Sequence, residues 1–438
     1  MRRGLRHAFL FLFAAGLAAC AESPFDPEEI RIPGERIPIM LLEQKLKPDV
    51  ERPAIQLPRP QVNPAWPQSG GYPNHAMHHL AIGDAPQEIW SSDIGSGSSD
   101  QRRLITPPVV AGGRVYVADA AGRISAFSVE DGDRLWRTDL TPDDEDDVTL
   151  SGGIAYAYGH LFVSTGFAQV VALNAETGEP AWRRALPSPM RSAPTVSNGR
   201  LFVTTVDNQF FAIDVRSGDT LWSHKGFEES AGILGGASPA VDGDVVIVPY
   251  TSGEVFAMLA NTGRILWSYS LASSRRGDAI SSIADIRGDP VIDRDQVFAV
   301  SHSGRIVALG VKSGEPLWEK EIGGIQTPWI AGDYIYLLTT NSEIVCLSRE
   351  KGGVVWVLEL PQYMDPEERA DPIVWNGPVL ASDRLLIAGS HGTVLAVSPY
   401  RGKVVGRMTL DDGATVTPVI AQGVIYFLTT DADLVAFR

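Results

Sequence analysis

Cysteine is nearly absent from this sequence of 438 residues, in which only Cys20 and Cys346 occur. A disulfide framework is therefore excluded as the main source of stability. The fold must depend on a hydrophobic core, and the 44% of hydrophobic residues is enough to form a large one. A long apolar run is also missing, because the N-terminal run Ala8–Ala19 is too short to span a bilayer comfortably.

Positive charge is scarce. The chain has 37 Lys and Arg against 53 Asp and Glu, a formal net charge of −16 at pH 7. Three of the arginines lie in the first six residues, so removal of a leader would make the chain still more acidic. Such a surface is repelled by nucleic acids and by anionic lipid headgroups. We therefore expect neither of them as a partner.

The short motifs of common catalytic sites are also missing: there is no G-x-S-x-G elbow, no Walker loop and no H-E-x-x-H. His75, His78 and His79 could offer two ligands to a metal, but no nearby carboxylate or cysteine completes a set. The acidic run Asp143–Asp147 lacks the glycine and the spaced glutamate of a calcium loop. We expect a surface or packing role for the histidines, a solvated loop for the acids, and neither metal nor cofactor.

A repeated pattern dominates the rest of the chain. A small residue is followed six positions later by glycine and four positions after that by tryptophan, at intervals of roughly 40 to 50 residues. The copies are Ala126/Gly132/Trp136, Ala172/Gly178/Trp182, Ala212/Gly218/Trp222, Ala257/Gly263/Trp267, Ala308/Gly314/Trp318 and Cys346/Gly352/Trp356, and a further copy, Ala396/Gly402, has Gly406 in place of tryptophan. Because Cys346 stands where the other copies have alanine, we expect a packed thiol rather than a nucleophile.

Each copy has the features of four short β-strands. In the first copy, Thr106–Val110, Arg114–Ala118, Arg123–Val129 and Arg134–Arg137 are rich in β-branched and aromatic residues and are joined by short turns. The glycine before each tryptophan suits a hairpin turn, since it adopts a positive φ without steric cost. We expect each tryptophan to pack over the sheet of an adjacent copy, beside the small residue. A sheet of this size cannot bury both faces alone, so the copies must stack.

The two ends of the chain predict how the stack closes. Thr417–Ile420 begins an eighth copy, which ends after a third strand at Leu434–Phe437. Gln87–Ser91 precedes the first copy and carries the unmatched Trp90. We predict that this strand completes the last sheet and closes an all-β, eight-bladed β-propeller of four-stranded antiparallel blades. An open β-solenoid is the alternative, but it does not explain complementary half-blades at the two ends.

The N-terminal segment has the features of a leader. Residues 1–19 contain three arginines, an apolar run and terminal small residues, as in a secretory signal peptide. Leu17–Cys20 also resembles the lipobox of bacterial lipoproteins, which implies cleavage before Cys20 and acylation of that cysteine. An ordinary leader with an incidental cysteine is the alternative. An aspartate after the cysteine would resemble an inner-membrane retention signal, so Ala21 favours the outer membrane.

The chain is thus expected to have three further parts after the leader. Residues 20–63 hold the lipidated cysteine and a proline-rich extended tether. Residues 64–86 form an approach segment, and residues 87–438 form the propeller.

Long insertions point to one face of the propeller. In an antiparallel blade, the connection from the fourth strand to the next blade lies on the same face as the turn between the second and third strands. The longest insertions fall on that face, at Thr138–Leu150, His224–Gly236, Tyr269–Arg287 and Leu358–Trp375. Insertions on one face of a repeat protein often mark its binding face; plain variation in loop length is the alternative.

The repeats resemble the pyrroloquinoline-quinone type of propeller repeat. With a lipobox and eight blades, the chain from about Trp66 onward resembles the BamB family of outer-membrane assembly lipoproteins. The resemblance implies a non-enzymatic scaffold that binds the periplasmic POTRA domains of BamA and works with the other lipoproteins of the assembly machinery. It also implies that the scaffold assists unfolded outer-membrane β-barrel proteins. The long proline-rich tether departs from this family.

The resemblance further implies where the partner binds. The BamA contact of this family uses the connections before the third and fifth repeats, one with an arginine among apolar residues and the other with two acids. Met190 and Arg191 match the first connection, with the arginine displaced by about two positions, and Asp285 matches the second. Arg287 stands where the second acid is expected. A partly buried arginine–carboxylate contact beside an apolar residue is a plausible hot spot; ion pairing between blades is the alternative.

Two other functions remain open at this point. A quinone-dependent dehydrogenase has the same type of repeat, but it uses an adjacent cysteine pair that this chain lacks. A lipoprotein that binds cell-wall material or polysaccharide would need exposed aromatic residues on the long loops, for which Phe227, Tyr363 and Trp375 are the candidates.

Overall fold

The computed structural model describes residues 45–438 except 52, 100–101, 144–151, 230–233 and 273–283. The chain divides into two compact units, Met1–Leu46 and Lys47–Arg438. Only the second is considered below, since nearly all of the first lies outside the described residues. In the part of the chain that the structure describes, no helix is long and apolar enough to cross a membrane.

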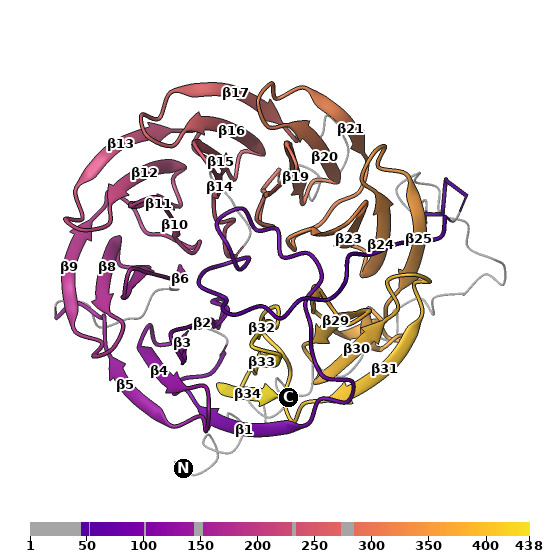
Figure 1. Cartoon of the computed structure of the whole chain (residues 1–438), viewed down its shortest axis with the longest axis horizontal. Coiled ribbons are helices and arrows are strands. Elements are labelled where there is room, and N and C mark those ends of the chain that lie inside the picture. The colour runs from indigo at the N-terminus through magenta and orange to yellow at the C-terminus, as the bar shows by residue number, and fades with distance from the viewer. Residues whose placement is uncertain (1–44, 52, 100–101, 144–151, 230–233, 273–283) are drawn as a thin grey trace, which may run out of the picture. The chain divides into compact units, whose positions relative to one another are not determined.

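The second unit is a ring of four-stranded antiparallel sheets, the blades, arranged around a central axis (Figure 1). In chain order, blade 1 is β2 (Val109–Ala111), β3 (Arg114–Ala118), β4 (Ile124–Ser128) and β5 (Arg134–Thr138); blade 2 is β6 (Gly153–Ala157), β7 (His160–Ser164), β8 (Gln169–Asn174) and β9 (Pro180–Ala185); blade 3 is β10 (Thr195–Ser197), β11 (Arg200–Thr204), β12 (Gln209–Asp214) and β13 (Thr220–Lys225); blade 4 is β14 (Ala240–Asp242), β15 (Val245–Pro249), β16 (Glu254–Leu259) and β17 (Ile265–Ser270).

The second half of the ring follows the same plan. Blade 5 is β18 (Val291–Asp293), β19 (Gln296–Ser301), β20 (Arg305–Gly310) and β21 (Pro316–Lys320); blade 6 is β22 (Trp329–Ala331), β23 (Tyr334–Leu338), β24 (Glu343–Ser348) and β25 (Val354–Glu359); blade 7 is β28 (Trp375–Ala381), β29 (Arg384–Gly389), β30 (Thr393–Val397) and β31 (Val404–Thr409); blade 8 is β32 (Val419–Ala421), β33 (Val424–Leu428), β34 (Asp433–Phe437) and β1 (Glu88–Asp93). A small hairpin, β26 (Tyr363–Asp365) and β27 (Ala370–Pro372), lies in the connection between blades 6 and 7.

The predicted closure of the ring is confirmed. Strand β1 pairs with β34 in antiparallel register, and Trp90 lies opposite Ala436. One strand from the N-terminal side thus completes the last blade, and the fold is an eight-bladed β-propeller as predicted from the repeat. This pairing also covers the outer edge of β34, which would otherwise be open to solvent.

Seven of the interfaces between blades share one contact. A tryptophan on the outermost strand lies against the turn glycine of the next blade, in the pairs Trp90–Gly132, Trp136–Gly178, Trp182–Gly218, Trp222–Gly263, Trp267–Gly314, Trp318–Gly352 and Trp356–Gly402. Each indole Nε1 also donates to a backbone carbonyl of that blade. The small residue of the repeat pairs with the tryptophan of its own blade, as Ala126 does with Trp136. The glycine is therefore needed for space as well as for its positive φ.

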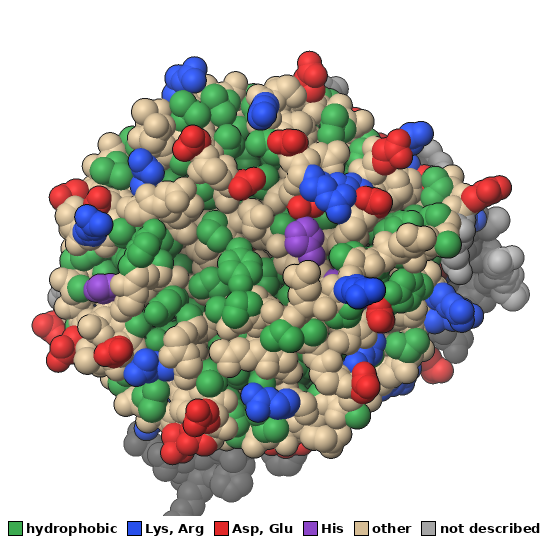
Figure 2. All heavy atoms as spheres, in the orientation of Figure 1, with side chains coloured by type: hydrophobic (Ala, Val, Ile, Leu, Met, Phe, Trp, Pro, Cys, Tyr) green, Lys and Arg blue, Asp and Glu red, His purple; other side chains and the backbone are tan. Residues whose placement is uncertain are grey.

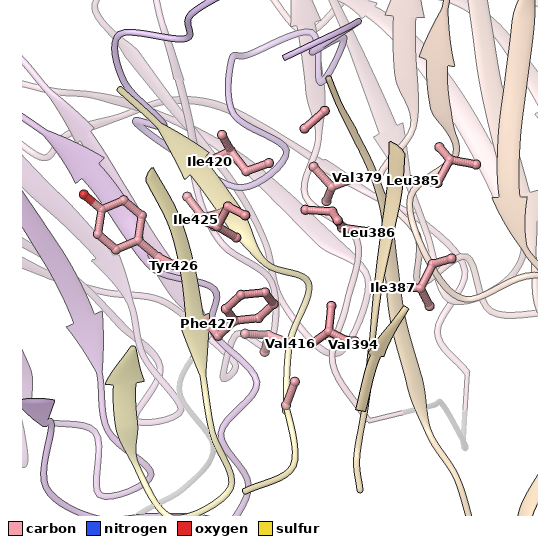
Figure 3. Close-up of a cluster of buried hydrophobic side chains, with 14 of the residues drawn as sticks. Val379, Leu385, Leu386, Ile387, Val394, Val416, Ile420, Ile425, Tyr426 and Phe427 are labelled. Atoms are coloured by element: carbon pink, nitrogen blue, oxygen red, sulfur yellow. The ribbon is translucent and has the colours of Figure 1, made fainter. Parts of the chain in front are cut away.

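The interface between blades 7 and 8 is different, because Gly406 replaces the tryptophan. Buried aliphatic and aromatic side chains of the two blades face one another there (Figure 3). Val379, Leu386 and Val394 come from blade 7, and Ile425 and Phe427 come from blade 8. The large buried area compensates for the missing indole contact.

The segment Gln61–Ile82, which we call the axial strap, crosses the centre of the ring (Figure 1). It contacts the innermost strands or their turns in blade order 8, 1, 2, 3, 4, 5, 6, 7. Its hydrogen bonds are Asn63 O to Gln422 N, Trp66 N to Val110 O, Pro67 O to Tyr156 N, Gln68 Oε1 to Val196 N, Pro73 O to Val241 N, Asn74 O to Ile292 N, His78 O to Trp329 Nε1 and Leu80 N to Leu380 O.

The strap closes one end of the axial channel. It lies at the turns that follow the innermost strands, so the connections that precede these strands lie on the opposite face. We call these two faces the strap face and the loop face. Hydrophobic side chains gather at the centre of the strap face (Figure 2). The proposed boundary between tether and approach segment at residue 63 remains a prediction.

Candidate partner-binding site at the loop face

Arg191 lies at the open end of the axial channel, in the connection that precedes β10. The chain is held on either side of it: Met190 N donates to Thr165 O (3.2 Å), and Ser164 Oγ donates to Ser192 O (2.7 Å). The Arg191 side chain itself is exposed and makes no hydrogen bond or ion pair with the described residues. A fixed backbone therefore presents an unpaired guanidinium to solvent.

Arg287 lies in the connection that precedes β18 and is partly buried. Its Nε donates to Leu234 O (2.7 Å), and its Nη1 lies 3.5 Å from Ile325 O, so it joins the connections on both sides. Burial lowers the pKa of the Arg287 guanidinium, while Asp285 and Asp289 act in the opposite direction. The charge is thus retained in a partly desolvated position, where an added acceptor binds more strongly than in water.

A glycine pair brings the two arginines to one rim. Gly235 and Gly236 precede β14 and lie between the connections of Arg191 and Arg287. A Cβ on Gly235 would lie 2.9 Å from Arg287 Nε, and one on Gly236 would lie 3.3 Å from Ser192 Cβ. Larger residues would push the connections apart. Arg191 and Arg287 both line the same cavity.

The other two candidate residues lie beneath this rim. Met190 is 0% exposed and Asp285 is 1% exposed. The backbone carbonyl of Asp285 accepts a hydrogen bond from His302 N (3.0 Å). The structure therefore brings all four residues to neighbouring connections of the loop face, but it leaves only Arg191 and Arg287 open to a partner.

The cavity at this rim is a blind cup of about 130 Å³ on the propeller axis. Trp66, Ser69 and His75 of the strap form its floor. Ser69 Oγ donates to Asp289 Oδ2 (2.8 Å), which ties the strap to the wall. Ligand pockets for molecules of cofactor size have about 300–1,000 Å³, so a tricyclic quinone does not fit this cup. Among the described residues, no group of three His, Cys, Asp or Glu side chains could hold a metal ion.

The three histidines of the approach segment anchor the strap. His75 Nδ1 donates to Pro290 O (2.7 Å), and His79 Nδ1 donates to Pro58 O (2.6 Å). His79 Nε2 accepts from Asp383 N (2.9 Å), and His78 Nε2 lies 3.7 Å from Asp293 Oδ1. Their roles are those of packing residues in the described structure.

Other candidates fall in different environments. Cys346 is a buried free thiol opposite Trp356 in the sheet. Cys20 and most of the acidic run Asp143–Asp147 lie outside the described residues. So do parts of three predicted insertions, at 144–151, 230–233 and 273–283.

Of the aromatic candidates on the long loops, Phe227 is 70% exposed and Tyr363 is partly buried. Trp375 is 4% exposed, and its Nε1 donates to Pro361 O (2.8 Å). The loop face therefore offers fewer exposed aromatic side chains than a polysaccharide-binding surface requires.

The strap and the glycine pair were missed by the reasoning from sequence. The strap has no periodic pattern, and its contacts are mainly backbone hydrogen bonds, which leave no mark on side-chain identity. The run Gly235–Gly236 was a visible signal, since adjacent glycines before a strand often mark a close approach of two chains.

Comparisons with known proteins follow the same direction as the fold. The family model described as "Outer membrane protein assembly factor BamB" matches residues 85–146 and 120–358. A protein of that name from Yersinia pestis is 26% identical over 361 residues, with 81% of this chain and 89% of that protein covered. One from Moranella endobia is 26% identical over 243 residues, and this chain covers 60% of it.

Solved structures share the propeller fold. BamB from Moraxella catarrhalis superimposes with a TM-score of 0.70 at 19% identity, with 81% of this chain and 100% of that chain covered. A quinohemoprotein alcohol dehydrogenase from Comamonas testosteroni has a TM-score of 0.62 at 13% identity, with 85% and 80% covered. These likenesses concern the fold alone. The family model, in contrast, matches more than half of the sequence, and the chain belongs to the BamB family of outer-membrane protein assembly factors.

Proposed function

We propose that this protein is a lipid-anchored scaffold on the periplasmic side of the outer membrane, where it assists the assembly of β-barrel proteins. The observation that carries the proposal is the match of the BamB family model to most of the ring. The partner of the scaffold is the POTRA region of BamA, together with the other assembly lipoproteins and unfolded β-barrel clients. The anchor is an acylated Cys20.

The loop face is the surface that binds BamA in this proposal. An exposed, unpaired Arg191 and a partly buried Arg287 lie on one rim, and both are donors suited to carboxylates. Met190 and Asp285 act indirectly, by holding the connections on which the arginines lie. Interfaces depend on a few such anchors, and the surrounding contacts mainly exclude water.

The scaffold has no enzymatic activity in this proposal. The narrow axial cup and the strap that closes it argue against a quinone-dependent reaction at the place where related propellers bind a cofactor. The specific observation that would favour a dehydrogenase, a wide axial pocket with a metal site, is missing from the described residues.

The proposal is tested by affinity purification of the tagged full-length chain from detergent-solubilised membranes, followed by identification of the co-purified proteins. We expect BamA and the assembly lipoproteins to co-purify with the wild-type protein. A Cys20→Ser variant should appear in the soluble periplasmic fraction instead of the membrane. Recovery of the wild-type chain without BamA would contradict the scaffold role, and membrane retention of the variant would contradict the anchor.

A further inference from the structure

Tyr158 occupies an unusual position for an aromatic residue. It is the first residue of the turn between β6 and β7, and its φ is 53°. This left-handed conformation is unfavourable for bulky side chains. The equivalent turn positions of the other seven blades hold Gly112, Asn198, Gly243, Arg294, Gly332, Ser382 and Gln422. Strained residues of this kind often belong to functional sites.

The Tyr158 ring is held across the junction of blades 2 and 3. Its hydroxyl oxygen accepts a hydrogen bond from Gly199 N (3.1 Å) on the neighbouring turn, and its carbonyl accepts one from His160 Nδ1 (3.0 Å). The side chain is nevertheless 64% exposed. A large aromatic side chain is thus fixed at both ends and still presented to solvent, on the strap face.

A groove of about 600 Å³ lies beneath this ring. Phe162 and Trp182 form its inner wall, with ring centroids 6.0 Å apart, and the Trp182 Nε1 is already used by Val215 O. His160 donates through Nδ1, which leaves its Nε2 as an acceptor. The volume lies within the usual range for sites that bind small molecules, about 300–1,000 Å³.

Polar groups surround the aromatic wall. The Asn198 amide and the Arg216 guanidinium both lie at the rim and are exposed. Neither side chain makes a hydrogen bond or ion pair with the part of the chain that the structure describes. None of the described residues that line the groove carries a carboxylate. On a protein with a net charge of −16, this groove stands out as a site without negative charge.

We propose that this groove binds an acidic oligosaccharide. The apolar C–H face of a pyranose ring stacks on Tyr158 and the inner aromatic wall. Its hydroxyl groups pair with Asn198 and with His160 Nε2, and its carboxylate pairs with Arg216, whose planar fork suits such an acceptor. The site lies on the face opposite Arg191 and Arg287, so the scaffold could hold glycan and protein partner at the same time.

The test is calorimetric titration of the full-length protein with two probes, an acidic tetragalacturonate and a neutral chitotetraose. Tyr158→Asn removes the ring and reproduces the residue that blade 3 already has at this turn, so the variant should fold. Arg216→Gln removes the charge alone. Phe227→Ala, an exposed aromatic residue on the loop face, is the matched control.

We expect tetragalacturonate to bind and Tyr158→Asn to weaken its binding at least tenfold. Arg216→Gln should weaken binding of the acidic probe and leave any binding of the neutral probe unchanged, and Phe227→Ala should change neither. The proposal is overturned if tetragalacturonate does not bind, or if Tyr158→Asn binds it as well as the wild-type protein. Equal loss with Phe227→Ala would also overturn it, because binding would then lie elsewhere.

Discussion

At the scale of single residues, the contact between a tryptophan and a glycine explains why both residues recur. The glycine turn has a φ near +70°, and a Cβ at Gly263 would lie 2.5 Å from Cε3 of Trp222. Two costs therefore add at this position, a strained backbone and a steric clash. A position with only the first cost exists in the same blade, since a Cβ on Gly243 (φ 55°) would meet nothing within 4 Å.

We predict that Gly263→Ala destabilises the fold more than Gly243→Ala does. The control should lower the free energy of unfolding by about 1–2 kcal/mol through the backbone alone. Gly263→Ala should cost a further ~1–3 kcal/mol, because the indole must move. Denaturant unfolding of both variants measures the difference. Equal losses would show that the glycine is needed only for its φ.

A second prediction at this scale concerns pH. Burial lowers the pKa of His224, whose Nδ1 lies 2.7 Å from Tyr250 Oη and whose ring lies 4.9 Å from that of Phe256. The folded state therefore prefers the neutral imidazole. Its contribution to stability is present above the unfolded pKa, about 6.5, and is lost as the pH falls through the lower folded pKa.

We expect His224→Phe to lose less stability than the wild-type protein between pH 7 and pH 5. Urea unfolding at the two pH values gives the comparison. His160→Phe serves as the control, since no burial effect on that histidine is involved in the argument. If His224→Phe and the wild type lose the same stability, another group controls the acid limb.

At the scale of elements, the axial strap is the part of the structure that joins all eight blades. Trp66 is 4% exposed, exchanges two backbone hydrogen bonds with Val110, and stacks near Trp329 with a centroid distance of 6.4 Å. The neighbouring Val62 is 66% exposed. The strap thus contains one deeply buried aromatic residue and a nearby exposed apolar one, which can be compared directly.

We predict that Trp66→Ala lowers the free energy of unfolding by about 3–5 kcal/mol, as expected for a buried tryptophan. Val62→Ala should change it by less than ~0.5 kcal/mol. Thermal unfolding followed by circular dichroism tests both variants. An unchanged midpoint for Trp66→Ala would show that the strap is not part of the cooperative unit.

The repeat elements could be predicted from the sequence, whereas the strap could not. Trp136, Gly178 and their equivalents are chosen by side-chain packing, so their spacing is visible in the sequence. The strap pairs through backbone atoms such as Asn63 O and Pro73 O, which every residue type carries. The same reason explains the site: the arginine positions were visible, but the burial of Met190 and Asp285 depends on connections from three blades.

At the scale of the whole molecule, the ring is closed twice. Strand β1 closes it at the circumference by pairing with β34, and the strap closes the axis at one end. Only the loop face leaves the axis open, and there Arg191 and Arg287 share one rim. The molecule therefore has one face that holds the chain together and another that is free to bind a partner.

The measurement that tests this account most directly is the affinity of the purified protein for the periplasmic region of BamA. Arg191→Glu should weaken binding at least tenfold and leave the β-sheet circular dichroism unchanged, since the side chain is exposed and unpaired. Arg407→Glu, the same charge reversal at an exposed arginine on β31, should bind like the wild type. Wild-type affinity for Arg191→Glu, or equal losses for the two variants, would contradict a partner site at the loop face.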